Sequence, residues 1–87
     1  MDINDWRIRI DELNDELIAL LNKRAGFATE IGKIKKAKGL PVFDASRENA
    51  VLEAIAAKAV KAGGPLSVES FKRIFQTIME ETRKVED

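Results

Sequence analysis

Apolar residues recur along this chain at spacings of three and four, which is the period of one face of an α-helix. No stretch alternates apolar and polar residues with a period of two, so the pattern predicts helices and no strands. In residues 1–38 the recurring positions form a heptad-like seam that continues for about eight turns. The seam consists of Trp6, Ile10, Leu13, Leu17, Leu20, Arg24, Phe27, Ile31 and Lys35.

Glycine and proline interrupt the helical period at two places, residues 39–41 (Gly-Leu-Pro) and residues 63–65 (Gly-Gly-Pro). These residue types mark turns, so they divide the chain into three helical segments. The segments are residues 1–38, 44–62 and 67–87. We expect an all-α fold of three helices, the first very long, in a single domain over residues 1–87.

Short polar residues stand where the second and third helices are expected to begin. Asp44 or Ser46 can cap the second helix, and Ser67 can cap the third. A side-chain oxygen at such a position accepts a hydrogen bond from a free backbone N–H of the first turn. Gly63 suits the C-terminal end of the second helix.

The first helix is too long for the domain that contains it. A helix over residues 4–38 extends about 50 Å, at 1.5 Å per residue. A compact chain of this length has a diameter of about 30 Å. Because the apolar seam runs along the whole helix, an isolated chain would leave much of it in water. We therefore expect a partner chain, most simply a second copy in a symmetric homodimer.

The composition removes several kinds of chemistry. Fifteen Lys and Arg balance fifteen Asp and Glu, giving a formal net charge of zero, which disfavours a nucleic-acid partner. The chain has no Cys, His or Tyr. Thiolate nucleophiles, imidazole bases and zinc sites built on Cys or His are therefore excluded. No apolar run approaches about 18 residues, and the acidic N-terminal stretch lacks a signal-peptide core, so we expect a cytoplasmic protein that does not enter a membrane.

Two cations interrupt the apolar seam of the first helix. Arg24 and Lys35 are 11 residues apart, so they share a face of the helix to within about 20°. A single charge at the fraying end of an apolar stripe is ordinarily a solvated side chain. Arg24 differs because the seam continues well beyond it, and a buried guanidinium needs an anionic partner. That partner is either Glu48 or Glu86 in an ion pair, or a bound ligand.

Polar groups also occupy the apolar stripes of the other two helices. Thr82 and Glu86 extend the stripe of the third helix on one face, and Glu48 heads the stripe of the second. Two cations, a hydroxyl group and acids that converge among apolar walls predict a pocket for a small anion with a non-polar body.

These residues fall into motifs that give the chain a family resemblance. Arg7 and Arg24 lie in the first helix, followed by Ile-Gly-x-x-Lys over residues 31–35 and Pro-Val-x-Asp-x-x-Arg-Glu over residues 41–48. The arrangement resembles the all-helical (AroQ-class) chorismate mutases, and the resemblance covers about residues 3–86. It implies an intertwined homodimer in which the long first helices pair and two active sites form. It also implies rearrangement of chorismate to prephenate in Phe and Tyr biosynthesis, with no cofactor, metal or covalent intermediate.

The resemblance assigns the two substrate carboxylates to two arginines. Arg24 would bind one carboxylate and Arg7 the other, with bidentate geometry fixing the reactive conformation. The two arginines are separated by about 25 Å along one helix, so Arg7 would come from the partner chain. Lys35 would donate a hydrogen bond to the ether oxygen, where negative charge develops as the bond breaks.

The other site residues follow from the same resemblance. Glu48 would accept from the ring hydroxyl beside the backbone of Asp44, Arg47 would line the same region, and Thr82 would lie near a carboxylate. Glu86 would be a second donor to the ether oxygen. A glutamate donates only in its protonated form, which burial favours, so activity would decline as the pH rises.

Two other interpretations stay open at this point. An isochorismate–pyruvate lyase uses the same scaffold with similar cations, although the acidic pair Asp44 and Glu48 favours the mutase. A non-catalytic helical dimerisation or regulatory module would explain the long seam, but it leaves the clustered charges without a purpose. A partner enzyme of the aromatic pathway is also compatible with the sequence.

Overall fold

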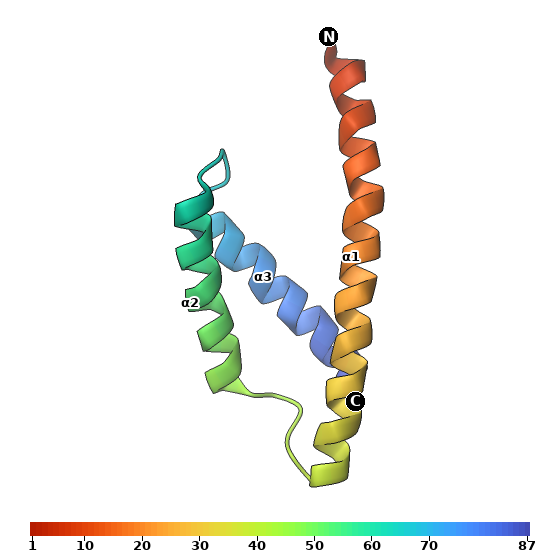
Figure 1. The fold of residues 1–87 in the computed structure, drawn as a ribbon, viewed down its shortest axis with the longest axis vertical. Coiled ribbons are helices and arrows are strands. Elements are labelled where there is room, and N and C mark those ends of the chain that lie inside the picture. The colour runs from red at the N-terminus through yellow and green to blue at the C-terminus, as the bar shows by residue number, and fades with distance from the viewer.

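The computed structural model describes residues 1–87 and contains helices only, which confirms the expected all-α fold. The helices are α1 (Ile3–Lys38), α2 (Ala45–Ala62), α3 (Val68–Arg83) and a short 3₁₀ helix, η1 (Lys84–Glu86). Figure 1 shows α1 as a rod that extends far beyond the rest, with α3 crossing obliquely from the end of α2 to the C-terminal half of α1. The protein measures 54 × 25 × 15 Å.

The starts of α2 and α3 and the end of α1 lie where the sequence predicts them. Asp44 rather than Ser46 caps α2, since its carboxylate accepts from the Arg47 backbone N–H at 3.0 Å. Ser67 caps α3 in the same way through Ser70. Gly39 ends α1 in the left-handed conformation, with φ 68°, which a residue with a Cβ adopts only at a cost.

The packed part of the protein is confined to the C-terminal half of α1. There α1 contacts α3 and η1, while α2 packs on α3. Only Ala28, Gly32 and Met79 are buried. Such a small interior provides little hydrophobic stabilisation for a chain of this size.

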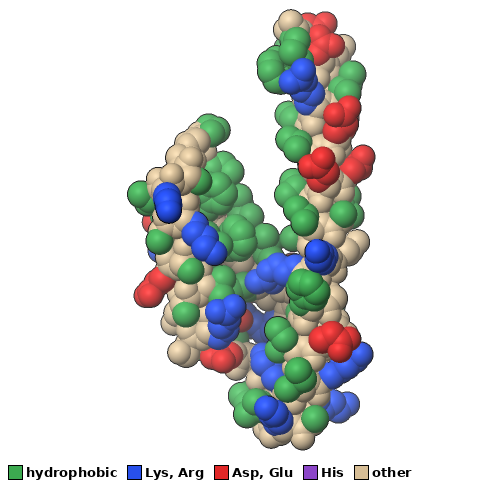
Figure 2. All heavy atoms as spheres, in the orientation of Figure 1, with side chains coloured by type: hydrophobic (Ala, Val, Ile, Leu, Met, Phe, Trp, Pro, Cys, Tyr) green, Lys and Arg blue, Asp and Glu red, His purple; other side chains and the backbone are tan.

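The N-terminal half of α1 carries its apolar seam uncovered. Its large seam side chains are all more than half exposed: Trp6, Ile10, Leu13, Leu17 and Leu20. Figure 2 shows hydrophobic side chains along one edge of this part of α1 and acidic side chains along the other. The length of α1 and the exposure of its seam are the features that predict a second chain.

The third helix ends earlier than the sequence pattern indicates. We expected one helix to residue 87 with Glu86 continuing its stripe, but α3 ends at Arg83 and the last turn is 3₁₀. The backbone N–H of Lys84 reaches the carbonyls of both Glu81 and Thr82, a tightening that is frequent at helix C-termini. It changes the direction of Glu86, which lies against α1.

None of the helices combines the length and the apolar character needed to cross a membrane.

Candidate active site

A cavity of about 450 Å³ lies between the C-terminal half of α1, the start of α2 and the end of α3. Lys and Arg side chains gather around the opening between α1 and α2 (Figure 2). Six of its lining side chains are apolar, and they come from every side of the cavity: Phe27, Ala28, Ile31, Val42, Val51 and Met79. All but one of the site residues predicted from the sequence line it: Arg24, Lys35, Asp44, Arg47, Glu48, Thr82 and Glu86.

Arg24 lines the cavity without a carboxylate partner. Its Nη1 donates to the hydroxyl of Thr82 at 2.8 Å, and that hydroxyl in turn donates to the carbonyl of Ile78 at 2.7 Å. No ion pair forms between Arg24 and either Glu48 or Glu86, because both acids are paired elsewhere. The intramolecular ion pair that the sequence allowed for this guanidinium is therefore absent.

Lys35 is held in place by two acceptors. Its Nζ donates to the carbonyl of Val42 at 2.7 Å and to Oε1 of Glu86 at 2.6 Å. The side chains of Lys35 and Glu86 are only 19% and 14% exposed. A cation with two fixed acceptors at a cavity wall has lost most of its rotational freedom, so it is preorganised to donate into the cavity.

Gly32 explains how Glu86 reaches Lys35. A Cβ built on Gly32 would meet the backbone of Glu86, including its carbonyl oxygen and its Cα at 2.6 Å. The helix interior therefore needs a residue without a side chain at this point, so that η1 can lie directly on α1. The other glycine inside α1, Gly26, has no neighbouring atom within 4 Å of the same position.

Glu48 has a partner that the sequence analysis did not identify. Its two carboxylate oxygens accept from Nε and Nη2 of Arg83 at 3.1 and 3.0 Å. The guanidinium of Arg83 also lies 4.4 Å from the centre of the Phe43 ring. A basic residue in the last turn of a helix ordinarily indicates only a favourable interaction with the helix dipole, so no signal in the sequence indicated this contact.

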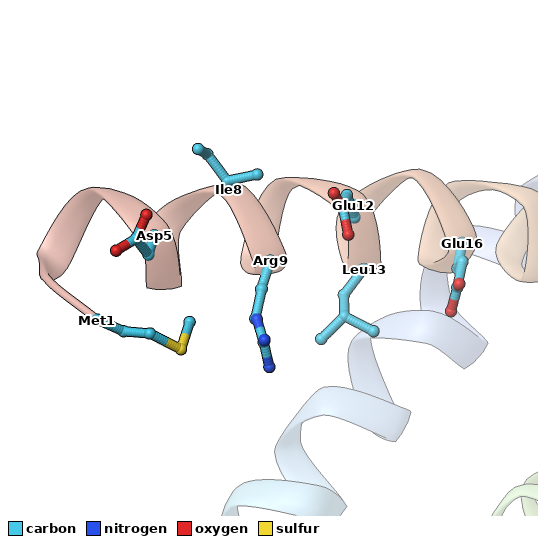
Figure 3. Close-up of a pocket in the computed structure, with 7 residues that line it drawn as sticks. All are labelled: Met1, Asp5, Ile8, Arg9, Glu12, Leu13 and Glu16. Atoms are coloured by element: carbon cyan, nitrogen blue, oxygen red, sulfur yellow. The ribbon is translucent and has the colours of Figure 1, made fainter.

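Arg7 is the one predicted site residue that does not line this cavity. It lies exposed on the uncovered half of α1. A larger hollow of about 810 Å³ occurs in that region, lined by residues of α1 and by Met1 (Figure 3). Because these side chains all project from one helix end with nothing opposite them, the hollow is an open surface, and it contains no predicted site residue.

The fold and this cavity define an all-helical protein with a pocket that is lined by cations, acids and apolar side chains. The chorismate mutase type II family model matches residues 6–87. The chain therefore belongs to the chorismate mutase type II family, as the sequence resemblance predicts.

Curated relatives share the sequence over most of this chain. The T-protein of Haemophilus influenzae is 36% identical over 80 residues, which are 92% of this chain and 21% of that protein. The bifunctional chorismate mutase/prephenate dehydratase of Aquifex aeolicus is 32% identical, over 90% of this chain and 22% of that protein. The chain thus spans about a fifth of the length of these relatives.

Solved structures share the fold over nearly their whole length. A chorismate mutase from Thermus thermophilus (form II) superposes with a TM-score of 0.89 at 30% identity, covering 97% of this chain and 92% of that one. A conserved hypothetical protein from Pyrococcus furiosus gives a TM-score of 0.72 at 33% identity, covering 98% and 95%.

Proposed function

We propose that this chain, as a single domain over residues 1–87, rearranges chorismate to prephenate in the cavity described above. The observation that carries the proposal is Arg24, a guanidinium without a carboxylate partner that faces a cavity with apolar walls. Chorismate has two carboxylates on a largely apolar frame, so it suits such a cavity. Membership of the family supports the same reaction.

In the proposed reaction no atom of the protein forms a covalent bond with the substrate. The ether C–O bond of the substrate breaks while a C–C bond forms between the side chain and the ring, all within one molecule. The protein holds the two ends of the substrate close together and stabilises charge as it develops. This chemistry is compatible with a chain that has no Cys or His.

Lys35 is the proposed donor to the ether oxygen. Its two acceptors, the Val42 carbonyl and Glu86, fix its ammonium group before substrate arrives. A preorganised donor of this kind contributes about 3–4 kcal/mol to transition-state stabilisation. Arg24 and Thr82 together would bind one carboxylate, since the hydroxyl aligns the guanidinium at 2.8 Å.

The opposite wall of the cavity would bind the ring. Glu48 is proposed to accept a hydrogen bond from the ring hydroxyl, and the backbone of Asp44 lies at the same end of α2. Arg47, one helical turn from Asp44, would border this end of the substrate.

The roles proposed so far leave the second substrate carboxylate without a cation. The charged residues lining the cavity are three cations and three acids: Arg24, Lys35, Arg47, Asp44, Glu48 and Glu86. Their charges cancel, whereas the substrate is a dianion. We propose that Arg7 of a second copy completes the site in an intertwined homodimer, because the exposed seam around Arg7 gives that copy a surface to bind.

The names of the relatives support a place in aromatic amino acid biosynthesis. The relative from Aquifex aeolicus is called bifunctional chorismate mutase/prephenate dehydratase. An enzyme that consumes prephenate is therefore a natural functional partner for the proposed activity.

The proposal is tested by adding the purified chain to chorismate and, separately, to isochorismate. We expect chorismate to disappear faster than its spontaneous rearrangement, with prephenate accumulating in equal amount. Release of pyruvate from isochorismate at a comparable rate would favour the lyase instead. If neither reaction exceeds its spontaneous rate, the interpretation as a non-catalytic helical module is the one that the result supports.

Glu86→Ala is expected to lower kcat/KM for chorismate by about tenfold or more, because it removes the carboxyl group that holds Nζ of Lys35 at 2.6 Å. In Glu86→Gln the side-chain carbonyl oxygen can still accept a hydrogen bond from Lys35, so the loss should be smaller. Steady-state kinetics for the two variants check this. Full activity in Glu86→Ala would contradict the role of Glu86.

Gly32→Ala is expected to lower kcat/KM by about tenfold or more, because the new methyl group forces the backbone of Glu86 away from Lys35. Gly26→Ala is the matched control in the same helix, and its methyl group enters open space. It should leave kcat/KM unchanged and stabilise the helix by about 1 kcal/mol. Equal activity in the two variants would show that the position of η1 does not matter for the reaction.

A further inference from the structure

Arg83 stands directly behind the cavity rather than in it. It is the last residue of α3, and it does not belong to the residues that line the cavity. Its partner Glu48 does line the cavity, and the two side chains are 30% and 16% exposed. Arg83 therefore does not line the cavity itself, and it can affect a bound molecule through the residues that it contacts and through its charge.

The contact with Glu48 fixes the orientation of a carboxylate. Nε and Nη2 of Arg83 each donate to a different oxygen of Glu48, at 3.1 and 3.0 Å. This fork geometry sets the plane of the carboxylate as well as its position. Each carboxylate oxygen retains further acceptor capacity, so Glu48 can still accept a hydrogen bond from a ligand in the cavity.

The second contact of Arg83 extends this support to the loop before α2. The guanidinium lies 4.4 Å from the centre of the Phe43 ring, a favourable cation–π distance. The preceding residue is Val42, whose carbonyl accepts from Lys35 at 2.7 Å. One side chain thus joins the end of α3 both to Glu48 and to the loop that holds Lys35.

The charge of Arg83 also changes the balance at the cavity. The lining charges cancel, and an unpaired carboxylate at Glu48 would repel a dianion. With Arg83 paired to it, that repulsion is offset, and the cations that face the cavity dominate. This matters most when Glu48 is charged and much less when it is replaced by a neutral residue.

We propose that Arg83 is a positioning residue of this site: it orients the Glu48 carboxylate toward the substrate ring and offsets its charge against the two substrate carboxylates. The inference rests on the proposed chorismate mutase function. It makes Arg83 relevant to substrate binding without contact to the substrate.

The test is a double-mutant cycle of Arg83→Met and Glu48→Gln, with kcat and KM for chorismate measured separately. We expect Arg83→Met alone to raise KM by about tenfold while kcat changes by less than about threefold, since a contact present in both ground and transition states alters KM. In the Glu48→Gln background, Arg83→Met should change KM by less than about twofold, because its partner charge is gone.

Two further variants separate positioning from a general loss of structure. Arg83→Lys keeps the charge but loses the fork, so its KM should lie between those of the unmodified chain and Arg83→Met. Lys84→Met is the matched control, since Lys84 pairs only with Glu81 on the exposed face of the last turn, and its KM should equal that of the unmodified chain.

The outcomes distinguish a failure of this inference from a failure of the proposed chorismate mutase function. If the unmodified chain and Lys84→Met convert chorismate but Arg83→Met has the same effect in both backgrounds, or none, the inference is wrong and the proposed function stands. If the unmodified chain and Lys84→Met do not convert chorismate, the proposed function fails and the inference fails with it.

Discussion

Arg24→Met is expected to lower kcat/KM for chorismate by about a thousandfold, because it removes the charged fork that we propose binds and orients one carboxylate. The loss corresponds to about 4 kcal/mol of transition-state stabilisation. Steady-state kinetics check it. Lys23→Met is the matched control, since Lys23 is the adjacent cation of α1, is exposed and lies outside the cavity. Its kcat/KM should be unchanged.

Arg24→Met, combined with Arg7→Met, also tests whether two chains share one site. Arg7→Met should also be nearly inactive, because the second carboxylate loses its cation. Mixing Arg7→Met and Arg24→Met chains under conditions that exchange subunits should restore about a quarter of the unmodified activity, since half of the dimers are mixed and each contains one intact site. Failure to restore any activity would contradict the donation of Arg7 by a second copy.

Lys35→Met is expected to lower kcat by about a hundredfold or more with a smaller change in KM, because the proposed donor to the ether oxygen acts mainly in the transition state. Lys33→Met is the matched control in the same helix. Lys33 forms an exposed pair with Glu30, at 68% and 67% exposure, and it does not line the cavity. Single-turnover rates for both variants check the prediction.

Two outcomes would contradict the role of Lys35. A change confined to KM would make it a substrate-binding cation only. Equal losses in Lys35→Met and Lys33→Met would indicate a general effect of positive charge near the C-terminal end of α1.

The fold could be predicted closely because its signals are local. The seam of α1, the caps at Asp44 and Ser67 and the stop at Gly39 each depend on neighbouring residues, so the helix boundaries follow from the sequence. The early end of α3 did not follow. It depends on the docking of η1 against Gly32, a contact between residues more than 50 positions apart.

The residues of the candidate site could be predicted from the sequence, but the ion pairs between them could not. The apolar stripes of the three helices indicated Arg24, Lys35, Glu48, Thr82 and Glu86. The family resemblance added Arg7, Asp44 and Arg47. Which acid pairs with which base is decided by the crossing of α3 over α1. That crossing pairs Lys35 with Glu86, pairs Glu48 with Arg83, and leaves Arg24 without a carboxylate partner.

The most direct measurement follows an isotopic label placed in the enolpyruvyl side chain of chorismate. After incubation with the purified chain, we expect all converted label in prephenate, still covalently attached to the ring and formed faster than in the absence of protein. Label recovered as free pyruvate, or conversion only at the spontaneous rate, would contradict the assignment of this cavity as a chorismate mutase site.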